Sequence, residues 1–147
     1  MRGDVELVEA PNNVAWIEAS SVFTGTFAIE LQPRQAGRAQ VDAIIGFNPV
    51  PAGKQRHVFA LSTHTHRLGT RASIHRLDAA GESSALLYES LHWAEPPLNM
   101  LEPALTLQPS ERLRLVCDYI NPSDQVVRFG AKAEDEMCML WAHIYDL

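Results

Sequence analysis

The sequence lacks the features that mark membrane, nucleic-acid-binding and nucleotide-binding proteins. No apolar stretch approaches the roughly 20 residues that a membrane span needs, and no apolar signal-peptide run follows the first four residues. The ten arginines and two lysines form no block that would follow a phosphate backbone, and the formal net charge is -6. A glycine-rich phosphate loop is also missing. We therefore expect no membrane span and no nucleic-acid partner.

The sequence has only two cysteines, and almost none of it shows the periodicity of an amphipathic helix. The two cysteines, Cys117 and Cys138, have no CxxC spacing, which argues against a zinc knuckle and a thioredoxin-type motif. Taken alone, they are compatible either with two buried thiols or with a disulfide. A chain of 147 residues is long enough for one core, so we expect a single domain over residues 1–147.

What the sequence does contain is a series of short segments rich in valine, isoleucine, leucine, threonine and aromatic residues. Turn sequences with proline, glycine, asparagine or aspartate separate them about every ten residues. This pattern is typical of an all-β antiparallel sandwich or barrel, because parallel strands would need long crossovers. The predicted strands are 14–19, 22–31, 39–47, 57–67, 71–77, 84–93, 104–107, 113–120, 126–129 and 137–145.

One of these strands carries two imidazoles in the stretch STHTHRLG, at residues 62–69. Side chains alternate faces along a strand, so His64 and His66 point the same way and are close enough to bind one ion. A solvated or hydrogen-bonded pair is the alternative. A cupin site would need a glutamate shortly after His66, but Arg67 to Arg71 contain none. The same alternation places His57 on the opposite face.

The last predicted strand has one face of Cys138, Leu140, Ala142 and Ile144, and another of Met137, Met139, Trp141 and His143. The first set is typical of a core, and Cys117 belongs to a similar set on strand 113–120. His143 shares the side of Met137, which makes it a candidate to support a site there. The acidic residues 134–136 before this strand are expected to be solvated.

Three blocks together resemble the C-terminal domain of the copper type II ascorbate-dependent monooxygenases, the family of peptidylglycine α-hydroxylating monooxygenase and dopamine β-monooxygenase. The blocks are HVFALSTHTHRLG at 57–69, ERLRLVCDYINPS at 111–123 and VVRFGAKAEDEMCMLWAHIY at 126–145. The resemblance extends from about residue 24 to 147. It implies a jelly-roll β-sandwich, in agreement with the strand pattern.

The resemblance also implies a site. His64, His66 and Met137 would bind one copper ion, at which dioxygen is activated for C–H hydroxylation. Two imidazoles and a soft thioether are a donor set that suits Cu(I). Cys117 and Cys138 would form a disulfide, which implies a periplasmic or secreted protein although no leader is visible.

The substrate positions depart from the family pattern. Where peptide-amidating members have an arginine, an asparagine and a tyrosine, this chain has Ser62, Met139 and Trp141. The histidines outside the His64–His66 pair are scattered, so electrons would come from another domain, another protein or a small reductant such as ascorbate. We expect a small-molecule substrate, and the sequence does not identify which one. The alternative function is a copper-binding or interaction module without turnover, and a metal-free structural module is a third possibility.

Overall fold

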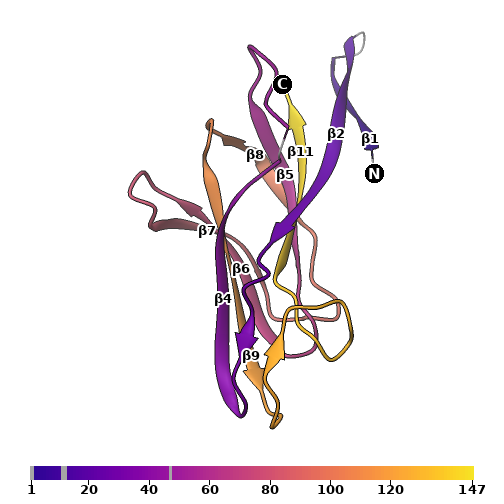
Figure 1. Ribbon diagram of the computed structural model, residues 1–147. Helices are drawn as coiled ribbons and strands as arrows, with labels where there is room; N and C mark the ends of the chain where they lie inside the picture. The colour runs from indigo at the N-terminus through magenta and orange to yellow at the C-terminus, as the bar shows by residue number, and fades with distance from the viewer. Residues whose placement is uncertain (1, 11–12, 47) are drawn as a thin grey trace.

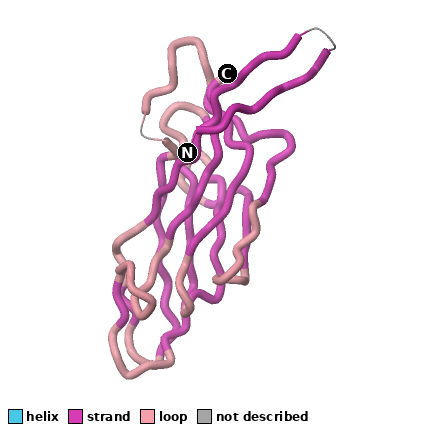
Figure 2. The backbone as a smooth tube through the Cα atoms, turned by 90° about the vertical axis from the view of Figure 1, so that its right-hand side faces the viewer, coloured by secondary structure: helices cyan, strands magenta, loops and turns pink. Residues whose placement is uncertain are grey.

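The computed structural model describes residues 2–10, 13–46 and 48–147, and all regular structure in these ranges is β-strand (Figures 1 and 2). None of the described residues forms a helix that is long and apolar enough to cross a membrane. The eleven strands are β1 (Arg2–Ala10), β2 (Asn13–Gly25), β3 (Glu30–Leu31), β4 (Gln35–Ile44), β5 (Arg56–His64), β6 (Gly69–Leu77), β7 (Ser83–Ser90), β8 (Asn99–Leu107), β9 (Arg112–Asn121), β10 (Val127–Arg128) and β11 (Met139–Asp146).

These strands form two main antiparallel sheets and a small ribbon. One sheet has five strands in the order β1-β2-β11-β5-β8, the other has four in the order β4-β9-β6-β7, and β10 pairs with β3. The two main sheets face each other, as Figure 1 shows. The predicted all-β antiparallel sandwich of jelly-roll kind is therefore confirmed.

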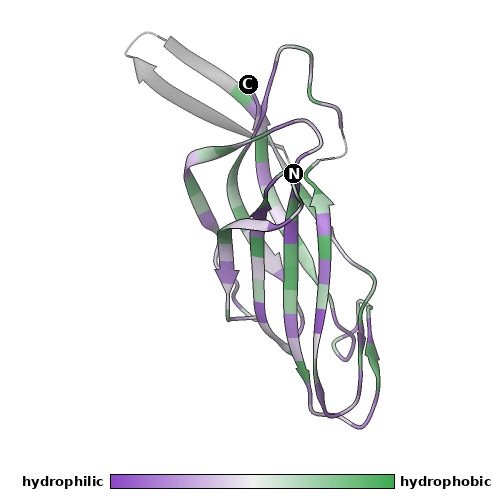
Figure 3. Cartoon of the chain, turned by 90° about the vertical axis from the view of Figure 1, so that its left-hand side faces the viewer, coloured by the Kyte–Doolittle hydropathy of each residue, from purple (hydrophilic) through white to green (hydrophobic). Residues whose placement is uncertain are grey.

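The core lies between the sheets and follows from the alternation of side chains. Leu113, Leu115 and Cys117 of β9 are fully buried against Leu140 and Ala142 of β11 in one apolar cluster. Figure 3 shows the corresponding alternation of hydropathy along the strands. Burying one such leucine stabilises the fold by about 1.5–3 kcal/mol relative to leaving it exposed.

Some predicted boundaries differ from the observed ones. No strand is predicted before residue 14, whereas β1 pairs with β2 over most of its length. The two predicted segments 14–19 and 22–31 are joined in β2, which continues to Gly25. The predicted strand 137–145 begins only at Met139, and the end of the predicted strand 39–47, Phe47, lies outside the described residues.

A β-bulge in β5 changes which side chains share a face. His143 pairs with Ala60 while the next residue of β11, Ile144, pairs with Val58, so Phe59 is an extra residue in β5. An extra residue reverses the alternation beyond it. The prediction that His57 lies on the face opposite His64 is therefore wrong: His57 stacks on Tyr145, with ring centroids 4.9 Å apart, on the same face as His64.

A network of ion pairs covers the outer face of the four-stranded sheet. Arg38 bonds to Asp118, and Arg114 binds Asp42 through two nitrogens at 2.7 and 2.8 Å. The Arg114 hydrogen bond lowers the pKa of Asp42. Such pairs on a solvated surface add little to stability and mainly keep this face hydrated.

We expect Asp42→Asn to cause a small loss of stability at pH 7 that disappears in acid. Because the folded-state pKa of Asp42 is below its unfolded value of about 3.9, its contribution is present above that pH and is lost as the pH falls through the folded pKa. Urea unfolding of the wild type and the variant between pH 7 and pH 2.5 measures the difference. A difference that stays constant with pH would contradict the assignment.

A disulfide between Cys117 and Cys138 joins the two sheets. Cys117 lies in β9 of the four-stranded sheet, and Cys138 directly precedes β11 of the five-stranded sheet. The carbonyl of Cys138 also accepts a hydrogen bond from the amide of Thr26. The disulfide implied by the sequence resemblance is thus present, and it holds the start of β11 against the core.

Candidate metal centre

The two predicted histidine ligands lie at the end of β5. His64 is the last residue of that strand and His66 lies two residues beyond it, so the predicted strand 57–67 ends earlier than expected. Their rings nevertheless converge, with centroids 5.2 Å apart and planes nearly perpendicular. Both side chains are half-buried. The arrangement leaves two imidazoles side by side at the edge of the sandwich.

A hydrogen bond fixes the tautomer of the His66 ring. Its Nδ1 lies 2.8 Å from the carbonyl oxygen of Asp135. A carbonyl oxygen only accepts, so Nδ1 carries the hydrogen and the neutral ring presents a free lone pair on Nε2. This is the tautomer that binds a metal through Nε2, and a carbonyl partner on the other nitrogen is the usual way proteins orient such a ligand.

The surroundings of His64 favour its neutral form. Burial lowers its pKa, and the adjacent His66 lowers it further. The neutral imidazole is the form that donates a lone pair to a metal. On its other side His64 meets Trp141, whose ring centroid is 6.0 Å away in an edge-on arrangement.

A buried carboxylate ties the histidine segment to the segment of Met137. Glu136 is fully buried, and its Oε2 accepts the amides of His66 at 2.9 Å and Met137 at 3.3 Å. Its Oε1 accepts the amide of Leu68 at 2.7 Å. One side chain therefore fixes the relative position of residues 66–68 and 136–137, which are about 70 residues apart in the sequence.

The expectation that residues 134–136 are all solvated is wrong for Glu136. Burial raises the pKa of this carboxyl group, while the three amides favour its charged form. The local sequence gives no signal of this role, because two of the three amides, those of His66 and Leu68, come from a distant turn. The only hint is that Glu136 directly precedes the Met137–Cys138 pair.

Met137 lies in the loop before β11 and is held by its backbone. Its carbonyl accepts a hydrogen bond of 2.6 Å from the hydroxyl of Tyr119, and its neighbour Cys138 forms the disulfide. Tyr119 is itself almost fully buried, and burial raises its pKa. Met137 as a whole is half-buried.

Met139 is the other methionine near the histidines, since it pairs with His64 across β5 and β11. Its sulfur, however, lies against β2: a Cβ placed on Gly25 would be 2.4 Å from Sδ of Met139. Because β11 separates β2 from β5, this thioether lies on the far side of β11 from His64. Gly25 is required here, because a side chain would also meet the carbonyl of Cys138.

The donor set fits a soft metal better than a hard one. Over the described ranges, no group of three or more histidine, cysteine, aspartate or glutamate side chains is arranged to hold a metal. A site built on His64 and His66 therefore needs a different third donor, and a methionine thioether matches copper in its reduced state. The donor types present, two imidazoles and a thioether, thus fit copper.

Three of the other four histidines bind other side chains through their rings. His75 bonds to two serine hydroxyls on the other sheet, and His57 lies 3.1 Å from the hydroxyl of Thr106. His143 is on the same face as His64, with its Nδ1 2.8 Å from Oγ of Ser21 and its ring 5.9 Å from that of Phe59. Support of the site by His143 stays a prediction.

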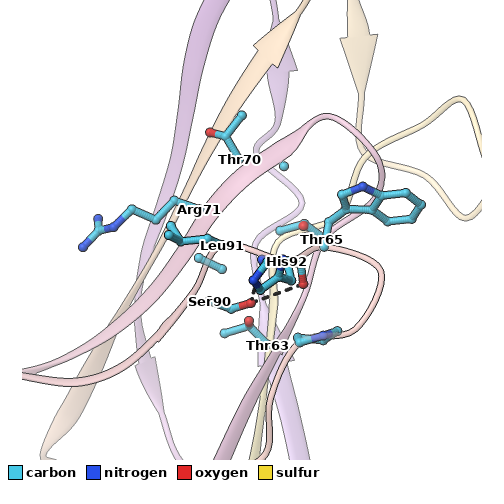
Figure 4. Close-up of a pocket in the computed structure, with 11 residues that line it drawn as sticks. Thr63, Thr65, Thr70, Arg71, Ser90, Leu91 and His92 are labelled. Atoms are coloured by element: carbon cyan, nitrogen blue, oxygen red, sulfur yellow. Dashed lines mark hydrogen bonds between the residues drawn. The ribbon is translucent and has the colours of Figure 1, made fainter.

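The reverse side of the histidine segment faces a small polar cavity (Figure 4). Thr63 and Thr65 line it from β5 and its extension, and Ser90 lines it from β7. Its volume is about 10 Å³, which is the room for one water molecule. This cavity is therefore too small to hold an organic substrate.

Comparison with known proteins gives one family match. The sequence model described as copper type II ascorbate-dependent monooxygenase, C-terminal domain, matches residues 49–147. A search of curated proteins finds no match. The matched range contains β5, β9 and β11 and begins after β2 and β4, although β2 pairs with β11 and β4 pairs with β9 in the same sandwich.

Proposed function

Because the chain belongs to the copper type II ascorbate-dependent monooxygenases, through their C-terminal domain, we propose that it is a mononuclear copper-binding domain that serves dioxygen activation and C–H hydroxylation. The observation that carries this proposal is the His66 ring, whose Nδ1 is bound to the carbonyl of Asp135 so that Nε2 is free beside His64. Copper supplies the redox chemistry of the family when it is bound.

The residues of the chain have distinct roles in this proposal. Nε2 of His66, the ring of His64 and the sulfur of Met137 would hold the copper ion. The Asp135 carbonyl orients His66, and Glu136 keeps the two ligand segments together through backbone amides. None of these groups has to act as a strong base, because hydrogen-atom removal needs no proton acceptor of high pKa.

Electrons for turnover would come from outside the described residues. These residues contain no cluster of three or more histidine, cysteine or carboxylate side chains that would hold an electron-transfer metal. We propose that a partner domain, a partner protein or a small reductant such as ascorbate supplies them. The disulfide and the family are compatible with an extracellular location, so we place the domain in an oxidising compartment, periplasmic or secreted.

A second candidate function is a copper-binding or interaction module without turnover. Two observations favour it: Ser62, Met139 and Trp141 occupy the substrate positions of the family pattern, and the described residues supply no electron-transfer metal site. Ascorbate-driven oxygen uptake separates the two functions. Copper-dependent uptake by the loaded domain supports the enzyme, and stoichiometric copper binding without uptake supports the module.

We expect the metal-free protein to bind one equivalent of Cu(I) in competition with a chromophoric chelator. His64→Ala and His66→Ala should each weaken binding by more than the roughly 10- to 100-fold that loss of an outer-shell partner costs. His92→Ala is the matched control, because that side chain is exposed and belongs to a different loop. Equal affinities of all three variants and the wild type would refute the copper site.

A further inference from the structure

The two sheets have outer faces of opposite character. The outer face of the four-stranded sheet carries the ion-pair network of arginines and carboxylates. Along β2, β11 and β5, the five-stranded sheet presents a face without aspartate, glutamate, lysine or arginine. Its outward positions are Ser21, Phe23, Gly25, Met139, Trp141, His143, Tyr145, His57, Phe59, Ala60, Ser62 and His64.

Four rings cross this uncharged face in a continuous row. Phe23 stacks on Trp141 with centroids 5.6 Å apart, Trp141 meets His64 at 6.0 Å, and His64 meets His66 at 5.2 Å. We refer to Phe23, Trp141, His64 and His66 as the ring row. Phe23 is 58% exposed and Trp141 is 36% exposed, so the apolar half of the row is open to solvent beside the histidines.

The neighbours of Trp141 leave its ring accessible. Ser62 pairs with Trp141 on the β5 side and is small, and Gly25, which has no side chain, follows Phe23 on the same face of β2. The sulfur of Met139 fills the space over Gly25. The result is an apolar platform, made of rings and one thioether, that ends at the two imidazoles.

We propose that this platform binds the substrate and that the substrate is an uncharged aromatic or similarly apolar molecule, held against Trp141 with its reacting C–H bond directed to His64 and His66. This inference rests on the proposed copper function of the same histidines. Aromatic faces attract rings through offset or edge-on stacking. A carboxylate or an ammonium group bound here would lose hydration without finding an ion-pair partner on the face.

The test uses three probes with the same phenylethyl skeleton and the metal-free protein. They are 2-phenylethanol, which is neutral, 3-phenylpropanoate, which is anionic, and 2-phenylethylammonium, which is cationic. Binding is followed by NMR through the indole N–H of Trp141, assigned with the Trp141→Phe variant, and through the ring protons of His64. We expect 2-phenylethanol to shift both signals and to bind at least about tenfold more tightly than either charged probe.

Two variants and one control complete the test. Trp141→Leu should weaken 2-phenylethanol about tenfold or more, whereas Trp93→Leu, which changes an exposed tryptophan at the cavity behind the histidine segment, should leave it unchanged. Ser62→Arg adds a cation next to Trp141 and should shift the preference toward 3-phenylpropanoate. Equal affinities for the three probes, or shifts confined to Trp93, would overturn the inference.

Three further outcomes can be distinguished from one another. Self-association of the protein that masks Trp141 would overturn the inference, because the face would then be covered by a second copy. Copper binding without probe binding would refute the substrate class and leave the proposed function intact. Probe binding without copper binding would refute the proposed function and with it the assignment of the bound probe as a substrate mimic.

Discussion

Glu136→Ala is expected to lower the free energy of unfolding by about 3–5 kcal/mol, because the change leaves the amides of His66, Leu68 and Met137 without their acceptor and opens a cavity in a fully buried position. Urea unfolding of the metal-free protein measures this loss. The same variant should shift the amide proton resonances of His66 and Leu68, since both lose a hydrogen bond.

Two further variants define the cause of this loss. Glu134→Ala removes an exposed carboxylate from the same loop and should change stability by no more than about 0.5 kcal/mol. Glu136→Gln keeps the shape but turns one acceptor into a donor that faces an amide, so it should also destabilise the protein, though less than alanine. A Glu136→Ala variant as stable as Glu134→Ala would contradict the role of this carboxylate.

The second large effect is expected on removal of the disulfide. Cys117 and Cys138 are 21 residues apart, and a cross-link over such a loop stabilises a domain by about 3 kcal/mol through the entropy of the unfolded chain. The Cys117→Ala/Cys138→Ala double variant should lose about this amount. Urea unfolding of the wild type with and without dithiothreitol provides the comparison.

Reduced wild type and the double variant should agree within about 1 kcal/mol, because both lack the same constraint and differ by only two small sulfur atoms. Equal stabilities of the oxidised and reduced wild type would contradict the predicted contribution. Loss of the cross-link should also loosen the segment of Met137, since Cys138 is its direct neighbour and joins it to β9.

The sequence allowed prediction of the parts of the fold that depend on local alternation. The buried set of Leu140, Ala142 and Ile144 and the opposite exposure of Trp141 follow from a period of two. The same rule failed for His57, because the extra residue at Phe59 in β5 reverses the alternation and leaves no mark in the local pattern.

Prediction of the site stopped at a similar limit. The spacing of His64 and His66 predicted that their rings lie together, which the 5.2 Å centroid distance confirms. The roles of Asp135 and Glu136 depend on a carbonyl and a carboxylate that contact the His66 turn, about 70 residues away in the sequence, only through the tertiary fold. Cysteine spacing alone left the disulfide open, and the family resemblance was needed to predict it.

X-ray absorption of the Cu(I)-loaded protein tests the central claim most directly, because it distinguishes sulfur from nitrogen neighbours of the metal. The account predicts two imidazole nitrogens and one sulfur, with the sulfur signal lost in Met137→Leu and retained in Met139→Leu, whose thioether lies against Gly25. A spectrum without sulfur, or a sulfur signal that survives Met137→Leu and disappears in Met139→Leu, would contradict the assignment of His64, His66 and Met137 as the copper ligands.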